Sequence, residues 1–265
     1  MEPPVIEKEQ VLIPTAKRLR KRLGSFKRSL LEAYDEAARR LASPERVFTE
    51  IYGQHKWGDP AAKEDFDSGL GSSASGAVET YISALKRLAA DKGFAGKTFV
   101  DIGCGDFRVS SKLLCLANSY IGVDVVAPLI DRNRRMFAGT NATFEHIDAT
   151  KQPLPPGDVC LLRQVLQHLS NKQIAVILPK LGQYKWVVIT EHVPTDANLA
   201  QPNLDKVHGA DVRVYQNSGV CLDQPPFNIP SKSLSLVLEV PGTDLGPGTH
   251  PGVIRTYLYE PSKVR

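Results

Sequence analysis

The chain has few cysteines, and their spacing does not form a metal site. Cys104, Cys115, Cys160 and Cys221 include no C-x-x-C pair, which argues against zinc and favours reduced thiols. Long apolar runs are also missing, since none approaches the roughly 20 residues that a membrane-spanning helix needs. No apolar stretch follows Met1 to form a signal peptide. We therefore expect a cytoplasmic protein.

Acidic residues are absent from the most basic segment of the chain. Residues 17–28 hold seven Lys or Arg and no Asp or Glu, while the whole chain is only +4. The rest of the chain, outside residues 17–28, therefore has a net negative charge and lacks the basic surface of a nucleic-acid-binding protein. Apolar residues recur at helical spacing over 30–41, so residues 1–46 are predicted to form a basic helical extension. Such a helix either makes peripheral contact with anionic lipid or RNA, or packs its apolar stripe on its own domain.

A strand followed by a glycine turn opens the central part of the chain. β-branched and aromatic residues over 98–102 predict a buried strand that runs into Gly103 and Gly105. A second short strand, 120–123, ends in Asp124, nineteen residues after Gly105. Strand, glycine turn, helix, strand and acid are typical of a nucleoside pocket in an α/β sheet. The glycines let the backbone approach the ligand, and the carboxylate accepts hydrogen bonds from ribose hydroxyls.

The turn lacks the third glycine of a dinucleotide-binding fingerprint. Asp101 precedes the two glycines, and Asp106-Phe-Arg follows them. A carboxylate beside the turn repels a pyrophosphate and suits a cationic ligand instead. S-adenosylmethionine fits, because it carries a sulfonium and an ammonium group and no phosphate. A nicotinamide-dependent oxidoreductase on the same type of sheet is the alternative that this acid argues against.

Further segments repeat the strand-and-acid pattern. Strands are expected over 142–147, 158–162 and 183–191, with Asp148-Ala149 after the first and Arg163-Gln164 after the second. With the Asp101-x-Gly-x-Gly105 turn, this series resembles the class I S-adenosylmethionine-dependent methyltransferases. In that family the acid at Asp148 hydrogen-bonds the adenine amino group, although a helix cap or Asx turn is the simpler interpretation. The resemblance implies a cofactor site made of Trp57, Asp101, Gly103, Cys104, Gly105, Asp124, Val125, Asp148, Ala149, Arg163 and Gln164.

Motifs outside this core narrow the resemblance to a group of uncharacterised bacterial methyltransferases. The chain has Cys104-Gly-Asp-Phe, His168-Leu-Ser and Pro226-Phe-Asn-Ile-Pro, with an N-terminal element near 48–58. The similarity covers about 47–260 and implies a methyltransferase domain over 47–265. Members of the group often look associated with polysaccharide or small-molecule modification. The resemblance therefore implies a small-molecule or glycan acceptor, methylated on a heteroatom with oxygen favoured, and leaves the oligomeric state open.

The expected fold is a Rossmann-like α/β sandwich with a seven-stranded, mostly parallel sheet and one antiparallel edge strand. Two closing strands are predicted over 233–240 and 253–259. A helix over 74–90 precedes the first strand, and Ser68–Ser72 before it is either a lid or a linker. Residues 194–232 have little periodicity and follow the fifth strand, at the strand ends where open α/β sheets bind ligands. They are interpreted as an acceptor-side insertion.

The expected chemistry is direct displacement of the sulfonium by an acceptor atom. Here the protein mainly aligns the two reactants, and a base is needed only for a hydroxyl acceptor. His168 is the best candidate for that catalytic base, with a structural role in a helix turn as its alternative. His192, His208 and Glu191 follow as weaker candidates. A non-catalytic scaffold that keeps the fold is the third hypothesis.

Overall fold

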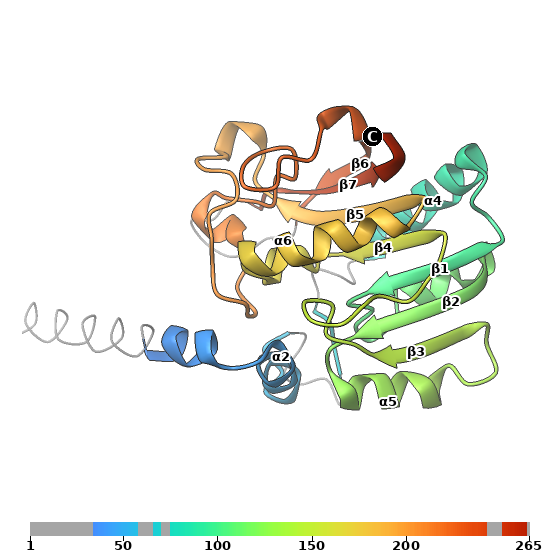
Figure 1. Cartoon of the computed structure of the whole chain (residues 1–265), viewed down its shortest axis with the longest axis horizontal. Coiled ribbons are helices and arrows are strands. Elements are labelled where there is room, and N and C mark those ends of the chain that lie inside the picture. The colour runs from blue at the N-terminus through green and yellow to red at the C-terminus, as the bar shows by residue number, and fades with distance from the viewer. Residues whose placement is uncertain (1–33, 58–65, 70–74, 243–250, 264–265) are drawn as a thin grey trace, which may run out of the picture. The chain divides into compact units, whose positions relative to one another are not determined.

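The computed structural model describes residues 34–57, 66–69, 75–242 and 251–263 (Figure 1). The chain divides into two compact units, 1–42 and 43–265. Of the first unit the described part, from residue 34, is helical as far as residue 41. The basic run over 17–28 lies outside the described residues, so its proposed contact with lipid or RNA stays a prediction.

A seven-stranded sheet forms the centre of the second unit. Its order is β3-β2-β1-β4-β5-β7-β6. The strands are β1 (Lys97–Ile102), β2 (Ala117–Asp124), β3 (Ala142–His146), β4 (Val159–Arg163), β5 (Trp186–Val193), β6 (Leu234–Pro241) and β7 (Val253–Tyr259). All seven predicted strands are thus confirmed within a few residues, and so is the Rossmann-like sheet.

One strand of the sheet is reversed, as predicted, but it does not lie at the edge. β7 pairs antiparallel with β5 on one side and with β6 on the other, and every other pair is parallel. β6 therefore occupies the edge. The short connection between β6 and β7 makes them an antiparallel pair, but it does not determine which of the two strands pairs with β5.

Four α-helices are described in this unit, and local sequence accounts for how two of them begin. They are α2 (Pro44–Gly53), α4 (Ser75–Lys92), α5 (Ala127–Met136) and α6 (Asn171–Lys180). Ser43 caps α2 by accepting a hydrogen bond from the Arg46 N–H, with proline in the first turn. Ser170 and Gln173 form a capping box at the start of α6. Figure 1 shows α6 on one face of the sheet and α4 on the opposite face.

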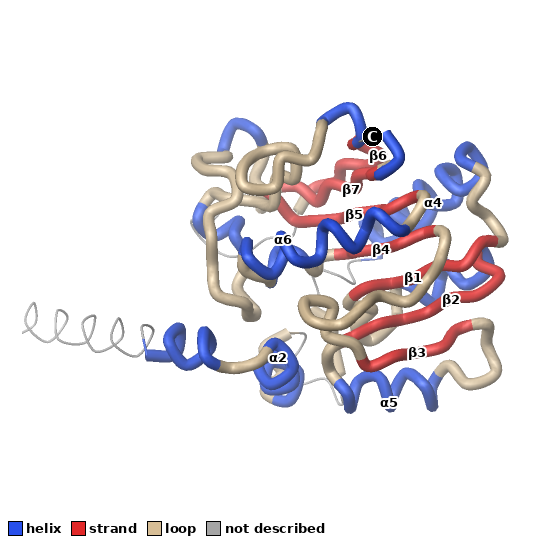
Figure 2. Tube along the Cα trace, in the orientation of Figure 1, coloured by secondary structure: helices blue, strands red, loops and turns tan. Residues whose placement is uncertain are grey.

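Two connections differ from regular α-helices. The helix expected between the glycine turn and β2 is η1 (Ser110–Leu116), a seven-residue 3-10 helix. Residues 194–232 contain the short 3-10 helices η4 (Asp196–Asn198) and η5 (Arg213–Gln216) and part of η6 (Ser231–Ser233). Figure 2 shows the rest of this segment as loop. It is nevertheless packed on the domain, because polar side chains such as Arg213 and Ser218 are buried within it.

The core lies on both faces of the central strands. Every residue of β5 is buried, which is typical of a strand covered on both faces. The rings of Phe94, Phe99, Tyr120 and Phe107 follow one another at centroid distances of 5.2–5.8 Å. Among the described residues, no helix combines the length and the apolar content that crossing a membrane requires.

Candidate active site

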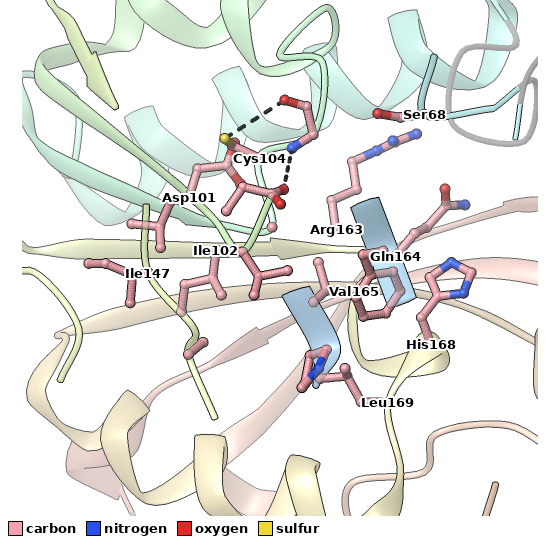
Figure 3. Close-up of a pocket in the computed structure, with 18 of the residues that line it drawn as sticks. Ser68, Asp101, Ile102, Cys104, Ile147, Arg163, Gln164, Val165, His168 and Leu169 are labelled. Carbon is pink, nitrogen blue, oxygen red and sulfur yellow. Dashed lines mark hydrogen bonds between the residues drawn. The ribbon is translucent and has the colours of Figure 1, made fainter. Parts of the chain in front are cut away.

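A cavity opens at the carboxyl ends of β1, β2 and β4, where parallel sheets bind ligands. It encloses about 1100 Å³, part of which is continuous with solvent. All twelve predicted site residues line it: Trp57, Asp101, Gly103, Cys104, Gly105, Asp124, Val125, Asp148, Ala149, Arg163, Gln164 and His168. Figure 3 shows Arg163, Gln164 and His168 on one side of the cavity and Asp101 and Cys104 on the other. Residues that lie far apart in the sequence thus meet in one place, and their individual roles stay predictions.

The glycine turn has no space for side chains. Gly103 and Gly105 have φ angles of +69° and +54°, in the left-handed region that glycine adopts without strain. A Cβ on Gly103 would lie 2.6 Å from a methyl carbon of Val165, and one on Gly105 would lie 2.5 Å from Oγ of Ser68. The turn therefore needs both glycines, for conformation and for space.

Asp124 ends β2 and binds back to the turn. One carboxylate oxygen accepts a hydrogen bond from the N–H of Gly105 at 3.1 Å, and the other accepts from the N–H of Val126 at 3.0 Å. Burial raises the pKa of this carboxyl group, and the backbone hydrogen bonds oppose that rise. Because a carboxylate has about four acceptor positions, it keeps capacity for ligand hydroxyls.

Asp101 and Arg163 carry opposite charges at neighbouring strand ends. Asp101 accepts a hydrogen bond from the Tyr120 hydroxyl at 3.1 Å, and burial raises its pKa to about 6. The Arg163 guanidinium lies over the ring of Tyr81, 5.3 Å from its centroid. Burial lowers the pKa of Arg163, but an arginine remains charged.

Asp148 follows β3 and forms a local turn as well as part of the cavity wall. Its Oδ1 accepts hydrogen bonds from the backbone N–H and the hydroxyl of Thr150, at 2.9 and 2.6 Å, and Lys151 lies 3.1 Å from Oδ2. Partial burial raises the pKa of Asp148, but these contacts outweigh it and the net change is downward. Asp148 therefore forms the Asx turn that the sequence allowed, and its contact with adenine stays a prediction.

The segment after β4 turns sharply into the cavity. Gln164 has a φ of +57°, unusual for a residue with a side chain, and its N–H donates to the Thr190 carbonyl at 2.6 Å. Such outliers occur where the surrounding structure fixes the backbone, often at functional sites. Val165, His168 and Leu169 follow it along the cavity wall.

His168 is half-buried and makes a hydrogen bond at each ring nitrogen. Nδ1 lies 3.1 Å from the Gly209 carbonyl, so Nδ1 carries the proton, and Nε2 lies 3.2 Å from the Gln167 amide nitrogen. The Gln167 amide oxygen accepts from the His192 N–H at 3.0 Å, which leaves the amide nitrogen to donate to His168. Burial and the nearby Lys206 lower the pKa of His168 to about 3, so the ring is neutral at physiological pH.

Aromatic rings from the N-terminal side close the cavity near His168. The Trp57 ring lies 4.9 Å from the His168 ring, measured between centroids. Tyr52 and Phe48, on α2, lie 5.2 and 5.9 Å from Trp57. Trp57, Tyr52 and Phe48 thus form a cluster of three aromatic side chains beside an imidazole, which we call the aromatic wall.

The other candidate bases lie outside the cavity. His192 contacts the Pro251 carbonyl through Nε2, and His208 lies 3.3 Å from the Gln173 amide. Glu191 is buried behind the loop after β4, where it accepts backbone hydrogen bonds. Among the described cavity-lining residues, none comes from 194–232. The contact of that segment with an acceptor stays a prediction.

Sequence reasoning named the turn but missed one of its partners. Asp106 lines the cavity, and its carboxylate accepts a hydrogen bond from the Ser68 N–H at 3.0 Å, while Ser68 Oγ accepts from the Asp106 N–H at 3.1 Å. Asp106 follows Gly105 directly, so its position in the turn could have indicated that it lines the site. Ile177 on α6 also lines the cavity, and only the three-dimensional fold brings it there.

Comparison with known proteins identifies the domain that holds this cavity. Residues 99–184 match the family described as a methyltransferase domain. No curated protein matches the chain.

Solved structures share the fold at low sequence identity. Magnesium protoporphyrin IX methyltransferase from Synechocystis PCC 6803 is 14% identical with a TM-score of 0.50, over 82% of this chain and 99% of that one. A SAM-dependent methyltransferase from Leishmania major is 13% identical with a TM-score of 0.50, over 81% and 85%. A dimethyladenosine transferase from Plasmodium falciparum is 20% identical with a TM-score of 0.46, over 72% of this chain, which spans 63% of that protein. At these identities the likeness shows the fold.

Residues 99–184 therefore match a methyltransferase domain, and the fold around them is one that solved methyltransferases share. S-adenosylmethionine is the cofactor that this match supports.

The charges in the cavity fit this cofactor. The described lining residues include four aspartates and one arginine, which suits a ligand with cationic groups and no phosphate. Gly103 and Gly105 line the cavity, and Asp124 at the end of β2 accepts a hydrogen bond from the Gly105 N–H.

Proposed function

We propose that the protein methylates a heteroatom of a small-molecule or saccharide acceptor that binds against the aromatic wall. The observation that carries this proposal is the composition of the cavity. Its lining combines carboxylates and the glycine turn with the rings of Phe48, Tyr52, Trp57 and His168. A charged nucleoside-like ligand suits the carboxylates and the turn, and a flat or ring-shaped molecule suits the aromatic rings.

The cofactor roles proposed here are those that the resemblance implies, and each of these residues lines the cavity. Asp124 would accept hydrogen bonds from the ribose hydroxyls, and Asp148 from the adenine amino group. Asp101 would attract the ammonium group, with Arg163 and Gln164 beside the methionine end. When bound, S-adenosylmethionine supplies a methyl group already activated by positive charge.

The protein's own contribution is to align the acceptor and to exclude water. Aromatic faces stack on planar groups and on the apolar faces of sugar rings, and stacked rings limit the orientations that a bound acceptor can take. An oxygen acceptor, the favoured prediction, must also lose a proton.

His168 is the candidate base nearest to that acceptor position. Its Nε2 already accepts a hydrogen bond, and its pKa of about 3 makes it a weak base at neutral pH. We therefore propose that His168 positions the acceptor and Trp57 in the neutral state, and the catalytic role predicted from the sequence is the alternative. Amine acceptors, which can lose their proton to solvent, would need no such base.

A direct test combines cofactor binding with a search for the acceptor. Calorimetry of the purified protein with S-adenosylhomocysteine should show binding, and NAD(H) should show none. Small-molecule and glycan extracts, incubated with protein and deuteromethyl-labelled S-adenosylmethionine, should yield a labelled product by mass spectrometry. Trp57→Ala should reduce product formation, with Asp131→Ala on the exposed surface of α5 as the matched control. Unchanged cofactor affinity in Trp57→Ala would support the acceptor role proposed here, and a loss of affinity would support the cofactor contact predicted from the sequence. Absence of binding at millimolar S-adenosylmethionine would support the scaffold hypothesis instead.

A further inference from the structure

The loop 164–169 carries four cavity-lining side chains but little regular structure of its own. Gln164, Val165, His168 and Leu169 face the cavity, and only the 3-10 turn η2 (Leu166–His168) lies within the loop. A loop that places both cofactor-side and acceptor-side residues needs its backbone fixed from behind. We propose that Glu191 and Arg213 are the positioning residues that do so, an inference that rests on the proposed function.

Glu191 binds the N–H groups of this loop. One carboxylate oxygen accepts a hydrogen bond from the N–H of Leu166, and the other accepts from the N–H of Gln167, both at 2.9 Å. Glu191 lies in β5 and is 4% exposed, so the strand fixes its position. Each carboxylate oxygen thus holds one of the first N–H groups of η2, which lack partners within a helix.

Arg213 binds the carbonyl groups of the same loop. Its Nη1 lies 3.3 Å from the Leu166 carbonyl and 3.1 Å from the Gln167 carbonyl, and its Nη2 lies 2.7 Å from the Leu169 carbonyl. Arg213 is 2% exposed and begins η5, more than forty residues farther along the chain. The two residues therefore hold opposite backbone groups of one turn.

The guanidinium of Arg213 has no spare donor. Nη2 also donates to Oδ1 of Asn171 at 3.0 Å, and Nε donates to the Leu204 carbonyl at 2.9 Å. These contacts and the three carbonyl bonds use as many N–H groups as a guanidinium has. A lysine has a single nitrogen with three donors and cannot reproduce this planar arrangement.

A second contact ties His168 to the same segment. The N–H of Gly209 donates to the His168 carbonyl at 3.0 Å, and the His168 ring binds the Gly209 carbonyl. The segment 203–213 thus supports the loop at its backbone and at the side chain that faces Trp57. Neither Glu191 nor Arg213 lines the cavity, so each acts on bound molecules only through the loop.

The test uses two variants that keep the size and polarity of these side chains. Arg213→Lys keeps the positive charge and loses the fork, and Glu191→Gln replaces one acceptor oxygen with an NH₂ group that faces a backbone N–H. Arg255→Lys is the matched control, because Arg255 pairs with Asp196 and Glu239 away from the loop. Folding is checked for each by circular dichroism and the thermal midpoint.

Two readouts separate positioning from general destabilisation. We expect S-adenosylhomocysteine affinity to fall at least tenfold in Arg213→Lys and Glu191→Gln under conditions where each is fully folded, with Arg255→Lys within twofold of wild type. Trp57 is one of two tryptophans, the other being the buried Trp186, so a change in tryptophan emission of the ligand-free protein reports the Trp57–His168 contact. A partial loss of affinity in Arg213→Lys and a larger loss in Arg213→Met would support the conclusion that the planar guanidinium holds the loop.

The outcomes distinguish this inference from the proposed function. Wild-type affinity and wild-type emission in folded Arg213→Lys and Glu191→Gln would overturn the positioning role. Failure of the wild-type protein to bind S-adenosylhomocysteine would overturn the proposed function, and the emission of the ligand-free variants would still decide whether Arg213 and Glu191 hold the loop. If Arg213→Met does not fold, the two milder variants decide the question.

Discussion

Buried carboxyl groups are the chemical signature of this cavity at the scale of single residues. Asp101 and Asp124 lie at adjacent strand ends, and burial raises the pKa of both. A cationic ligand reverses this effect, because it stabilises the ionised carboxylates that burial disfavours. Cofactor binding and carboxyl ionisation are therefore linked.

Replacing Asp124 with alanine should weaken cofactor binding at least tenfold. The variant loses charge-assisted hydrogen bonds, worth roughly 1.5–3 kcal/mol each, to the ribose hydroxyls. It also leaves the N–H groups of Gly105 and Val126 without their acceptor, so some loss of stability is expected. Calorimetry with S-adenosylhomocysteine measures the affinity, with Asp131→Ala as the surface control. Unchanged affinity would show that Asp124 does not bind the ribose.

The affinity for S-adenosylmethionine should fall as the pH drops below about 6. The pKa of Asp101 is about 6 in the folded protein and 3.8 for the free group, so the carboxyl group becomes neutral in this range. The expected loss is about tenfold near pH 5, because each unit below the pKa reduces the ionised fraction about tenfold. Asp101→Asn should bind weakly at all pH values. A flat profile for the wild-type protein would contradict the role of Asp101.

The contribution of Asp101 to folding stability changes with pH in the opposite direction to the cofactor affinity. Between pH 3.8 and about 6 the folded state binds more protons at this group than the unfolded state does. The stability that Asp101 contributes therefore falls as the pH rises through this window, and it is constant above it. A difference in thermal midpoint between wild type and Asp101→Asn that grows from pH 4 to 6 would measure this effect.

At the scale of elements, the glycine turn and the segment 66–69 fit together too closely for an added side chain. Gly105→Ala would force Oγ of Ser68 away and break its hydrogen bonds with the Asp106 N–H and the Tyr52 hydroxyl. Gly139→Ala is the matched control, since Gly139 also has a positive φ, +81°, but no atom lies within 4 Å of its Cβ position. Both variants should lose roughly 1–2 kcal/mol from the left-handed backbone.

Only Gly105→Ala should also lose S-adenosylhomocysteine affinity, by tenfold or more. Calorimetry at a temperature where both variants are folded, together with thermal midpoints, separates crowding at the site from backbone strain. Equal affinity in the two variants would mean that the turn tolerates a side chain and does not closely approach the cofactor.

Sequence patterns predicted the elements whose causes are local. β4 and β5 contain the apolar runs 159–162 and 186–189, which suit a buried strand, and Asp124 is the last residue of β2, directly after Val123. α6 was not predicted, although Ser170 and Gln173 form the capping box at its start.

The parts that the sequence did not predict depend on contacts between distant residues. Arg213 lies in a segment without periodicity, and its role follows from carbonyl groups more than forty positions earlier. The 3-10 geometry of η1 and the position of β7 between β6 and β5 depend on packing within the folded domain. Nothing in the local pattern distinguishes these arrangements from their alternatives.

At the scale of the whole molecule, the site belongs to the unit that begins at Ser43. Deleting residues 1–42 removes the basic run but keeps Ser43, the cap of α2, and every cavity-lining residue. The truncated protein should bind S-adenosylhomocysteine within twofold of the full chain. Loss of cofactor binding in a folded truncation would place the extension at the site.

The same truncation tests the two uses proposed for the basic extension. If it is a tether, sedimentation with anionic vesicles should be salt-sensitive for the full chain and absent after truncation. If it packs on the domain instead, the thermal midpoint should drop and neither form should bind vesicles.

The place of β7 has a consequence for synthesis of the chain on the ribosome. β5 is complete at Val193, yet its outer edge pairs with β7, which is complete only at Tyr259. Until then β5, whose residues are all buried in the folded protein, presents unpaired N–H and C=O groups along this edge. An edge of this kind recruits strands from other nascent chains. β6 emerges earlier but does not cover this edge in the native order. A stalled or prematurely terminated chain that ends between β6 and β7 should therefore be a substrate for holdase chaperones and should aggregate in their absence.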